Sequence, residues 1–521
     1  RALHPKAERN DLASVAIHYN KANKLTMPDF KGKHLPEITK EMQKDIAAYN
    51  NTDVQACYEV YQEMIKGFPS AELDLIDTTV RMFTEPVLRV DLPLAQKELK
   101  DEQDRKAEAI LLSGVDIDTL SSNPKFVKAV EALGVGVPLK PSPTIQGKMI
   151  PAVAKSDEAL QALLLHPNQK VAALVHGRLA AKSTIGESRA MRLILDGTGH
   201  NLPAYYNYAM AHTLRWSGGN KINLQNLKQA QKVGGGLRKC ILAPEGYELV
   251  VVDSAQIEAR IVAWLAKEEQ ILEAFRLYRD IYSEFASEAY QRPVTRADKE
   301  ERFVGKTCVL GLGFGMGGVK LQSTLLTQSL NQGLDPVRLP IEVCFGLVNT
   351  YRRKYTNIVD LWKTMNNNGI GAMLGGDDFN QLCLNFVEGK CELPNKLALL
   401  YPDLKARVVQ TGNRVFRDVF TKTVYDASYL ASRSRNKIYG GLLTENVVQA
   451  LARIVVGDVI NLIAEEYRVV MITHDEIVFV AQKSEAPTAL DWAIGLMSQS
   501  PSWAPDLPLS ADGSYDVSYS K

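Results

Sequence analysis

Two aspartates accompany short hydrophobic runs and could bind a metal ion. The segment 248–253 is mostly apolar and ends in Asp253, after which the apolar spacing becomes helical. The runs 468–472 and 477–480 flank Asp475, and we predict a hairpin with Asp475 near its turn. A carboxylate beside apolar neighbours is costly unless it is exposed, paired or bound to a cation. Either acid alone is more simply explained as a solvated turn residue. A metal site is favoured only when the two acids are considered together with the basic residues that lie between them in the sequence.

Basic side chains lie between these two acids in the sequence. Arg302 and Lys306 are four residues apart, so a helix would place both on one face, and Leu310 and Phe314 continue the row. Two cations, then an apolar and an aromatic group, follow the order of phosphates, sugar and base along a nucleotide. The spacing therefore favours a nucleotide-binding helix. The alternative is a surface helix with a buried end.

Glycines at 313, 315 and 318 match the spacing of a dinucleotide-binding loop. That loop follows a strand in nucleotide-binding domains, whereas here a helix is predicted before it. We therefore reject a Rossmann site. The glycines would instead permit a bend and a close approach of a base or another backbone segment.

Helical periodicity and breaker residues predict the elements that must position these groups. The region 134–151 is dense in Gly, Pro and Lys and predicts a loop, and a second loop-rich region is predicted after 369. The two acids are 222 residues apart in sequence, so only tertiary folding can bring them together. Helices are predicted at 40–66, about 94–112, 271–290, from about 297 into the glycines, and 341–365.

Bulk composition excludes several classes of protein. The 521 residues are 45% hydrophobic and 23% charged, which argues against a disordered chain or a collagen-like chain. The net charge of +1 neither favours nor excludes a nucleic-acid partner, and the six cysteines contain no CxxC pair that would predict a zinc site. We expect no membrane partner and a cytoplasmic location, because the sequence contains neither a run of about 18 apolar residues nor a recognisable signal peptide.

Taken together, the motifs resemble those of family A DNA polymerases, the family of bacterial and phage DNA polymerase I. The resemblance covers roughly residues 70–521, and the motifs occur in the family's order and at similar separations. It is strongest to the phage members, and for a phage-encoded protein the expected location would be the host cytoplasm. The matching segments are 253–260, the pattern Arg302-xxx-Lys306-xxx-Leu310-Gly-xx-Phe314-Gly315, 474–476, 213–226, 182–184 and 445–449.

The resemblance implies a magnesium site for phosphoryl transfer. Asp253 and Asp475 would bind two Mg²⁺ ions with help from the Ser254 carbonyl, and Glu476 would be an accessory acid. Two such ions activate the primer 3′-hydroxyl and neutralise the departing pyrophosphate. Lys306 is implied as the residue that protonates the leaving group.

The same resemblance implies residues that bind the incoming nucleotide and the DNA. Glu258 occupies the position that blocks a ribose 2′-hydroxyl, so deoxynucleotides are expected as substrates. Arg215 and Gln449 would donate to acceptors in the minor groove, although Gln449 alone could be an ordinary exposed helix residue. The remaining nucleotide-binding candidates are Arg302, Lys306, Leu310, Phe314, Gln256 and Tyr282, and the remaining DNA-binding candidates are Gln225, Asn226, His474, Lys182, Ser183 and Thr184.

Several positions depart from the family pattern. Ser254 and Ala255 replace the usual Tyr-Ser, Tyr282 replaces a frequent His, and Phe314 replaces the usual Tyr. Leu310 and Glu445 also differ from many members. We expect altered sugar, template-base and primer contacts and weak acceptance of chain terminators, with the reaction retained.

The first residues resemble part of a proofreading exonuclease. Tyr49 and Asp53 match its third motif, Tyr-xxx-Asp, and helical spacing would put both on one face, where Asp53 could bind a metal ion. The other exonuclease acids are expected upstream of Arg1. We therefore predict a truncated exonuclease domain and a chain without 3′-end proofreading.

The expected fold is α+β, a right-hand polymerase with a partial, RNase H-like exonuclease remnant. The expected function is DNA-directed DNA polymerase, a phage-like replication enzyme that extends a primer on template DNA with deoxynucleoside triphosphates. A single-subunit RNA polymerase and a catalytically inactive DNA-binding replication protein remain as alternatives. The expected divisions are an exonuclease remnant (1–67), a linker (68–89), a thumb (90–195), a first part of the palm (196–265), fingers (266–440) and a second part of the palm (441–521).

Overall fold

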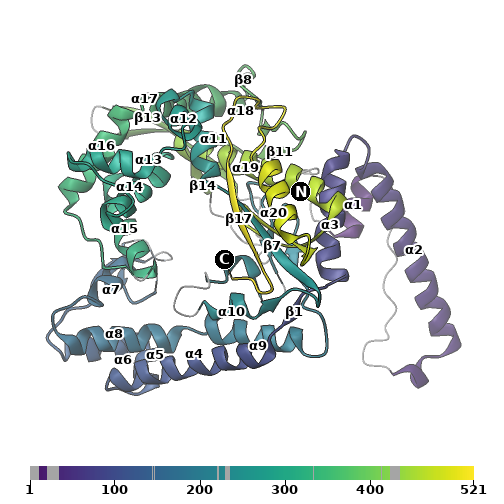
Figure 1. Ribbon diagram of the computed structural model, residues 1–521, viewed down its shortest axis with the longest axis horizontal. Coiled ribbons are helices and arrows are strands. Elements are labelled where there is room, and N and C mark those ends of the chain that lie inside the picture. The colour runs from purple at the N-terminus through teal and green to yellow at the C-terminus, as the bar shows by residue number, and fades with distance from the viewer. Residues whose placement is uncertain are drawn as a thin grey trace. The chain divides into compact units, whose positions relative to one another are not determined.

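A computed structural model describes residues 11–19, 21, 34–142, 145, 147–155, 157–219, 222–228, 235–332, 334–411, 414–422 and 435–520. The chain contacts divide it into two compact units. The first comprises Arg1–Asp77, Met210–Leu214 and Lys363–Ile454, and the second comprises Thr78–Ala209, Arg215–Trp362 and Val455–Lys521. Figure 1 labels the elements of both units.

The second unit contains the four-stranded antiparallel sheet that carries the predicted acids. Its strand order is β15 (Arg468–Thr473), β16 (Glu476–Gln482), β7 (Tyr247–Ser254), β17 (Ala511–Asp516). Helix α20 (Ala486–Met497) contacts β7, β16 and β17, and Figure 1 shows the teal strand β7 beside the yellow β17 and α20. The four central residues of β7 are buried, so burial of both faces explains the continuous apolar run in the sequence.

A glycine allows one of these strands to approach closely. Gly513 of β17 pairs with Val252 of β7, and a Cβ at Gly513 would lie 2.3 Å from the Val251 carbonyl oxygen. Any larger residue would therefore clash with the backbone of β7. This position fixes β17 against the strand that ends in Asp253.

Helices with a separate hydrophobic core form another part of the second unit. The core is built around Phe126, Leu160 and Leu174, and Arg178 of α8 is buried beside it. The Arg178 guanidinium donates to the carbonyls of Leu120 (2.7 Å) and Val153 (3.0 Å), so its polar atoms are satisfied inside the core. These bonds tie α8 to α5 and to the segment after β3. Figure 1 shows α4, α8 and α9 lying side by side.

The other elements of the second unit have the following bounds: β1 (Arg89–Val90), α4 (Leu92–Leu112), α5 (Ile117–Ser121), α6 (Asn123–Glu131), β2 (Leu139–Pro141), β3 (Met149–Pro151), α7 (Glu158–Leu163), α8 (Gln169–Lys182), α9 (Ile185–Gly197), β4 (Tyr206–Asn207), β5 (Ser217–Gly218), η2 (Leu224–Asn226), α10 (Gly236–Lys239), β6 (Ile241–Leu242), α11 (Ile257–Ala266), α12 (Glu269–Arg276), α13 (Ile281–Tyr290), α14 (Lys299–Leu312), α15 (Gly318–Gln332) and α16 (Ile341–Lys354).

The first unit has two antiparallel sheets and a buried ion pair. One sheet has the order β11-β10-β9-β8 and the other β12-β13-β14. Both Arg453 and Glu72 are almost fully buried, and the guanidinium donates to the two carboxylate oxygens at 2.5 and 2.7 Å. The bounds are α1 (Leu12–His18), η1 (Leu35–Glu37), α2 (Lys40–Met64), the π-helix η3 (Met365–Gly369), α18 (Ile370–Met373), β8 (Phe379–Gln381), β9 (Leu384–Val387), β10 (Lys390–Glu392), β11 (Ala398–Leu400), β12 (Lys405–Thr411), β13 (Arg414–Lys422) and β14 (Arg435–Ile438).

Three helices continue from one unit into the other: α3 (Ser70–Thr84), α17 (Thr356–Thr364) and α19 (Gly440–Glu466). Among the described residues, α19 alone is long and apolar enough to cross a membrane by length and composition. However, 72% of its most apolar window is buried in the fold. Such burial is typical of the core helix of a globular protein.

The predicted elements are partly confirmed and partly corrected. The helices expected at 40–66 and 94–112 are present as α2 and α4, and the α+β class is confirmed. The single helix expected at 271–290 is wrong, because the chain breaks between α12 and α13, where Tyr278 has a left-handed φ of 53°. The helix expected at 341–365 is likewise two helices separated at Tyr355. Apolar periodicity continues across such short breaks, so it cannot locate them.

Two predicted loops contain secondary structure. Within 134–151, strands β2 and β3 pair antiparallel, although residues 143, 144 and 146 lie outside the described part. After 369, the chain continues as α18 and then forms the sheet of β8–β11. Strands of three or four residues are too short to give a periodic signal.

Candidate active site

The strand pairing brings the two predicted metal-binding acids together. Asp253 lies at the end of β7, and Asp475 lies in the two-residue turn between β15 and β16. In the register of β7 and β16, Glu476 stands opposite Asp253, and the Ser254 N–H donates to the Asp475 carbonyl at 3.2 Å. His474 completes the turn with a left-handed φ of 55°, which is uncommon for a non-glycine residue. The predicted hairpin and the predicted proximity of the acids are both confirmed.

Arg215 bridges two of the carboxylates. Its Nη2 donates to Glu258 Oε1 at 2.7 Å and to Asp475 Oδ1 at 3.3 Å. Glu258 lies in the first turn of α11, directly after β7, so the strand-to-helix corner places it beside the acids. Removal from water raises the pKa of Asp475 to about 6, Glu258 and Asp253 raise it as well, and Arg215 opposes them. One guanidinium therefore compensates only part of the negative charge at this site.

The donor set fits a divalent cation. In the described ranges no group of three or more His, Cys, Asp or Glu side chains is arranged to hold a metal ion. The predicted set is smaller, with two carboxylates and one backbone carbonyl, and oxygen ligands of this kind suit Mg²⁺. The raised pKa of Asp475 reflects unfavourable negative charge that a cation would relieve. The Ser254 hydroxyl is buried without a hydrogen-bond partner in the described structure. Ser254, whose carbonyl is the predicted ligand, is therefore not held by a hydrogen bond of its own side chain.

The basic helix is α14, and it packs tightly on α13. A Cβ at Gly305, between Arg302 and Lys306, would lie 2.2 Å from the Tyr282 carbonyl oxygen. The glycine therefore permits the close approach of the two helices. As a result, the Arg302 guanidinium lies over the Tyr282 ring, 5.4 Å from its centroid. Two of the predicted nucleotide-binding residues are thus brought together.

Asp280 is a functional candidate that the sequence analysis missed. Its carboxylate accepts hydrogen bonds from Arg302 Nε at 2.6 Å and Nη2 at 3.3 Å, and from the Ser283 hydroxyl at 2.8 Å. Burial disfavours the charge, but these hydrogen bonds outweigh it and hold the pKa of Asp280 below its usual value. The available signal was an acid directly before the observed helix α13, but the helix predicted at 271–290 ran through this position.

The other predicted residues lie on separate elements. Lys182 ends α8, Ser183 and Thr184 connect it to α9, and Gln225 and Asn226 belong to η2. Residues 220 and 221 of the 213–226 motif are outside the described residues. Gln256 precedes α11 with a φ of 51°, Leu310 lies on α14, and Phe314 follows that helix. Burial, and then Arg215 and Arg238, lower the pKa of His474.

Three predicted residues lie on helices of the first unit. Tyr49 and Asp53 are one turn apart on α2, as expected from their spacing. Gln449 lies on the part of α19 that belongs to this unit and donates to Glu445 Oε1 at 3.3 Å. Their predicted contacts with DNA or metal remain predictions.

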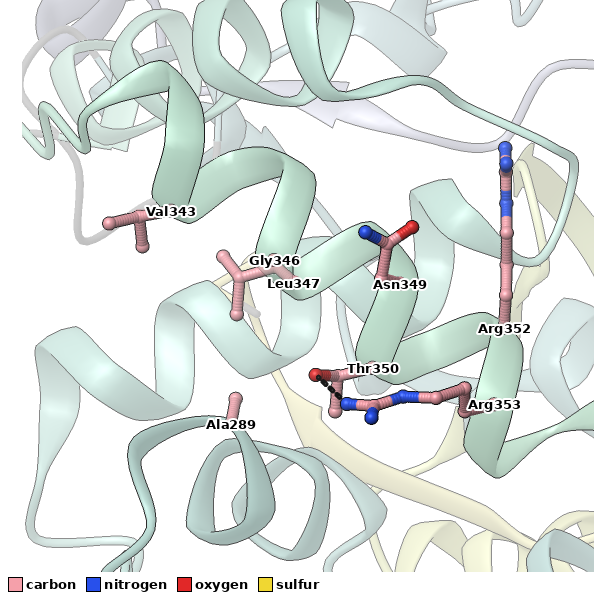
Figure 2. A pocket seen from close by; sticks show the side chains of 8 residues that line it. All are labelled: Ala289, Val343, Gly346, Leu347, Asn349, Thr350, Arg352 and Arg353. Atoms are coloured by element: carbon pink, nitrogen blue, oxygen red, sulfur yellow. Dashed lines mark hydrogen bonds between the residues drawn. The ribbon is translucent and has the colours of Figure 1, made fainter.

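A pocket of about 700 Å³ lies on α13 and α16 and contains none of the predicted site residues. Figure 2 shows its lining side chains, which include Arg352 and Arg353 in the last turn of α16. Cations at that end complement the carbonyls of the helix terminus. The two arginines therefore have a structural role at the end of α16.

Comparison with solved structures gives the fold. The chain superimposes on the POL domain of Pol1 from M. smegmatis, in complex with DNA primer-template and dNTP, with a TM-score of 0.66 and 18% identity, over 100% of this chain and 80% of that one. The fold is therefore that of a polymerase domain.

Sequence comparisons find similar DNA polymerases. Residues 137–367 match the model of DNA polymerase family A. The chain is 26% identical to the DNA polymerase of Bacillus phage SP02 over 570 residues, covering 100% of this chain and 82% of the phage protein. It is 27% identical to DNA polymerase I of Pseudomonas aeruginosa over 61% of this chain and 36% of that protein. The chain is therefore similar to family A DNA polymerases over residues 137–367 and to a phage DNA polymerase over its whole length.

Proposed function

We propose that this protein is a family A DNA polymerase and that it extends a DNA primer on a DNA template with deoxynucleoside triphosphates. The observation that carries the proposal is the pairing of β7 with β16, which unites Asp253 and Asp475, 222 residues apart in sequence, beside Arg215 and Glu258. A protein that only binds DNA has no need of such a cluster of partly exposed carboxylates. In this proposal Asp253, Asp475 and the Ser254 carbonyl would hold two Mg²⁺ ions.

Those ions would supply the activation of the primer hydroxyl and the neutralisation of charge on the pyrophosphate. The residues of the chain have separate tasks. Arg302 binds the triphosphate, and Asp280 and the Tyr282 ring hold its guanidinium in place. Lys306, one turn along the same helix, binds the phosphates and protonates the leaving pyrophosphate. Leu310 and Phe314 contact the sugar and base, together with Gln256.

Glu258 selects the deoxyribose sugar. Its Oε1 accepts a hydrogen bond from Arg215, so the carboxylate is fixed rather than free to rotate away from the site. Arg215 and His474 contact the primer and template near the reacting end, and Gln449 of the first unit is proposed separately as a DNA-binding residue. Gln225, Asn226 and the segment 182–184 contact the DNA backbone further away.

The domain division and the exonuclease assignment are parts of the same proposal. We propose that residues 1–67 belong to an exonuclease-like region, with a linker at 68–89, a thumb at 90–195, a palm at 196–265 and 441–521, and fingers at 266–440. Tyr49 and Asp53 would belong to the exonuclease-like region, and the enzyme would act in the cytoplasm. Incubation of the chain with a mismatched primer and Mg²⁺ tests the predicted lack of proofreading, because trimming of the primer would contradict it.

Primer extension by wild type and by Asp475→Ala tests the main proposal. We expect the substitution to abolish extension while DNA affinity changes little, because phosphate contacts are spread over many residues. Asp516→Ala, which removes an exposed acid from β17, is the matched control and should extend normally. Equal extension by Asp475→Ala and wild type would refute the metal assignment. Preferential use of ribonucleotides would instead favour an RNA polymerase.

A further inference from the structure

Tyr519 is a fully buried residue that packs beside the acid-bearing sheet. Its N–H donates to the Ile241 carbonyl at 2.9 Å, and the Val517 carbonyl accepts from the Ala243 N–H at 2.8 Å. The Arg238 guanidinium covers the tyrosine ring at 4.5 Å from its centroid. Backbone and ring contacts therefore hold the hydroxyl of Tyr519 in one place.

The Tyr519 hydroxyl is bound to the accessory acid. It donates a hydrogen bond to Glu476 Oε1 and lies 3.3 Å from Thr473 Oγ1. Burial, and then the charge of Glu476, raise the pKa of Tyr519, so the hydroxyl keeps its proton and remains a donor. A hydrogen bond to an ionised carboxylate is among the stronger kinds. The Glu476 side chain is therefore anchored by a buried partner.

Glu476 lies close to the two proposed metal-binding acids. Glu476 follows Asp475 directly and stands opposite Asp253 in the strand register. A third carboxylate at this position has the right chemistry to act as an additional cation ligand. With Oε1 bound to Tyr519 and the residue only 7% exposed, the carboxylate has little freedom to turn toward a cation.

We propose that Tyr519 is a positioning residue that anchors Glu476 and keeps its carboxylate out of the ligand set of Asp253 and Asp475. The inference rests on the proposed function, because it concerns the divalent ions which that function requires. Tyr519 acts through Glu476 and touches neither substrate nor metal. Removal of its hydroxyl removes one anchor of Glu476, so the carboxylate can turn more readily toward a cation, which changes cation affinity.

Binding of Mn²⁺ to the full chain without DNA, measured from the EPR signal of free Mn²⁺, tests this inference apart from activity. Tyr519→Phe keeps the ring on Arg238 and removes only the hydroxyl. We expect it to tighten Mn²⁺ binding by about threefold or more, since a less firmly anchored carboxylate can bring its charge and an oxygen ligand to the cation. In a Glu476→Gln background the same substitution should have no effect. Tyr515→Phe, at an exposed tyrosine of β17, is the matched control and should leave binding unchanged.

An equal change in both backgrounds, or no change in either, would overturn the inference. A purely structural tyrosine would affect Mn²⁺ binding whether or not residue 476 is charged. If Tyr519→Phe does not fold, Glu476→Gln alone tests the inference. Loss of the Glu476 charge should change Mn²⁺ affinity by less than about threefold if Glu476 is anchored away from the cation, and by more than about tenfold if Glu476 is a ligand. Asp475→Ala must abolish Mn²⁺ binding at the site. If Asp475→Ala still binds Mn²⁺ at the site, the proposed function is refuted. If Asp475→Ala loses Mn²⁺ binding but Tyr519→Phe binds Mn²⁺ as the wild type does, only this inference is refuted.

Discussion

The Asp280 carboxylate accepts hydrogen bonds from both Nε and Nη2 of Arg302, at 2.6 and 3.3 Å. The two residues lie on different helices, with Asp280 just before α13 and Arg302 in the first turn of α14. The contact fixes the direction of the guanidinium that the proposed function assigns to the triphosphate. Because the pKa of Asp280 is lowered, the pair is ionised throughout the neutral range.

Replacement of Asp280 should therefore weaken nucleotide use without removing the acids of the active site. We expect Asp280→Asn to lower kcat/KM for deoxynucleotides by about tenfold, mainly through KM, because loss of a charge-assisted hydrogen bond releases Arg302. Steady-state extension kinetics measure this. Glu284→Gln, which disturbs an acid of α13 paired with Arg279 instead, is the control. Identical kinetics for both variants would show that Arg302 needs no such support.

Glu258 should determine discrimination against ribonucleotides. Glu258→Ala removes the side chain that is proposed to meet the 2′-hydroxyl, so we expect ribonucleotide incorporation relative to deoxynucleotides to rise by roughly tenfold or more. Competition assays with both nucleotides give the ratio. Glu258→Gln keeps the volume and should retain most of the discrimination. A ratio that Glu258→Ala leaves unaltered would mean that sugar selection lies elsewhere.

Cation binding should depend on pH through Asp475. The pKa of Asp475 is raised to about 6. Between about pH 4 and 6 the folded protein therefore binds this proton more tightly than the unfolded chain does. The contribution of Asp475 to folding stability accordingly becomes less favourable as the pH rises through that window. A protonated carboxyl does not bind a cation. We therefore expect Mn²⁺ affinity to fall by about tenfold between pH 7 and pH 5. A flat profile of affinity against pH in EPR titrations would contradict the assignment of Asp475 as a ligand.

The buried pair of Arg453 and Glu72 should be important for stability. Arg453 also donates to the Leu214 carbonyl at 3.1 Å, and Asn395 donates to Glu72 at 2.6 Å, so the pair links three separate segments of the first unit. Arg453→Met leaves a buried carboxylate without its cation and should lower the free energy of unfolding by about 3–5 kcal/mol. Urea denaturation measures the loss.

The double substitution Arg453→Met with Glu72→Met provides the control for that prediction. It removes both charges, so we expect it to recover much of the lost stability. A double variant as unstable as Arg453→Met would show that packing, rather than the unpaired charge, causes the defect.

Local sequence was sufficient where the signal is short and continuous. The apolar segment before Asp253 and the two runs around Asp475 predict β7, β15 and β16, because strand patterning and turn position depend on neighbouring residues. The helix carrying Arg302 and Lys306 follows from their spacing in the same way. The sequence did not predict the break at Tyr278, because a single left-handed residue leaves the apolar periodicity almost unchanged.

What the sequence by itself determined is therefore the chemistry available to this protein: the acids at strand ends, the cationic helix and the family motifs. The tertiary structure decided which of these groups meet. It paired Glu476 with Asp253, gave Arg302 the carboxylate of Asp280, and placed Tyr519 against Glu476. Such contacts join residues tens to hundreds of positions apart, and their geometry depends on strand register and helix packing, which no local pattern encodes.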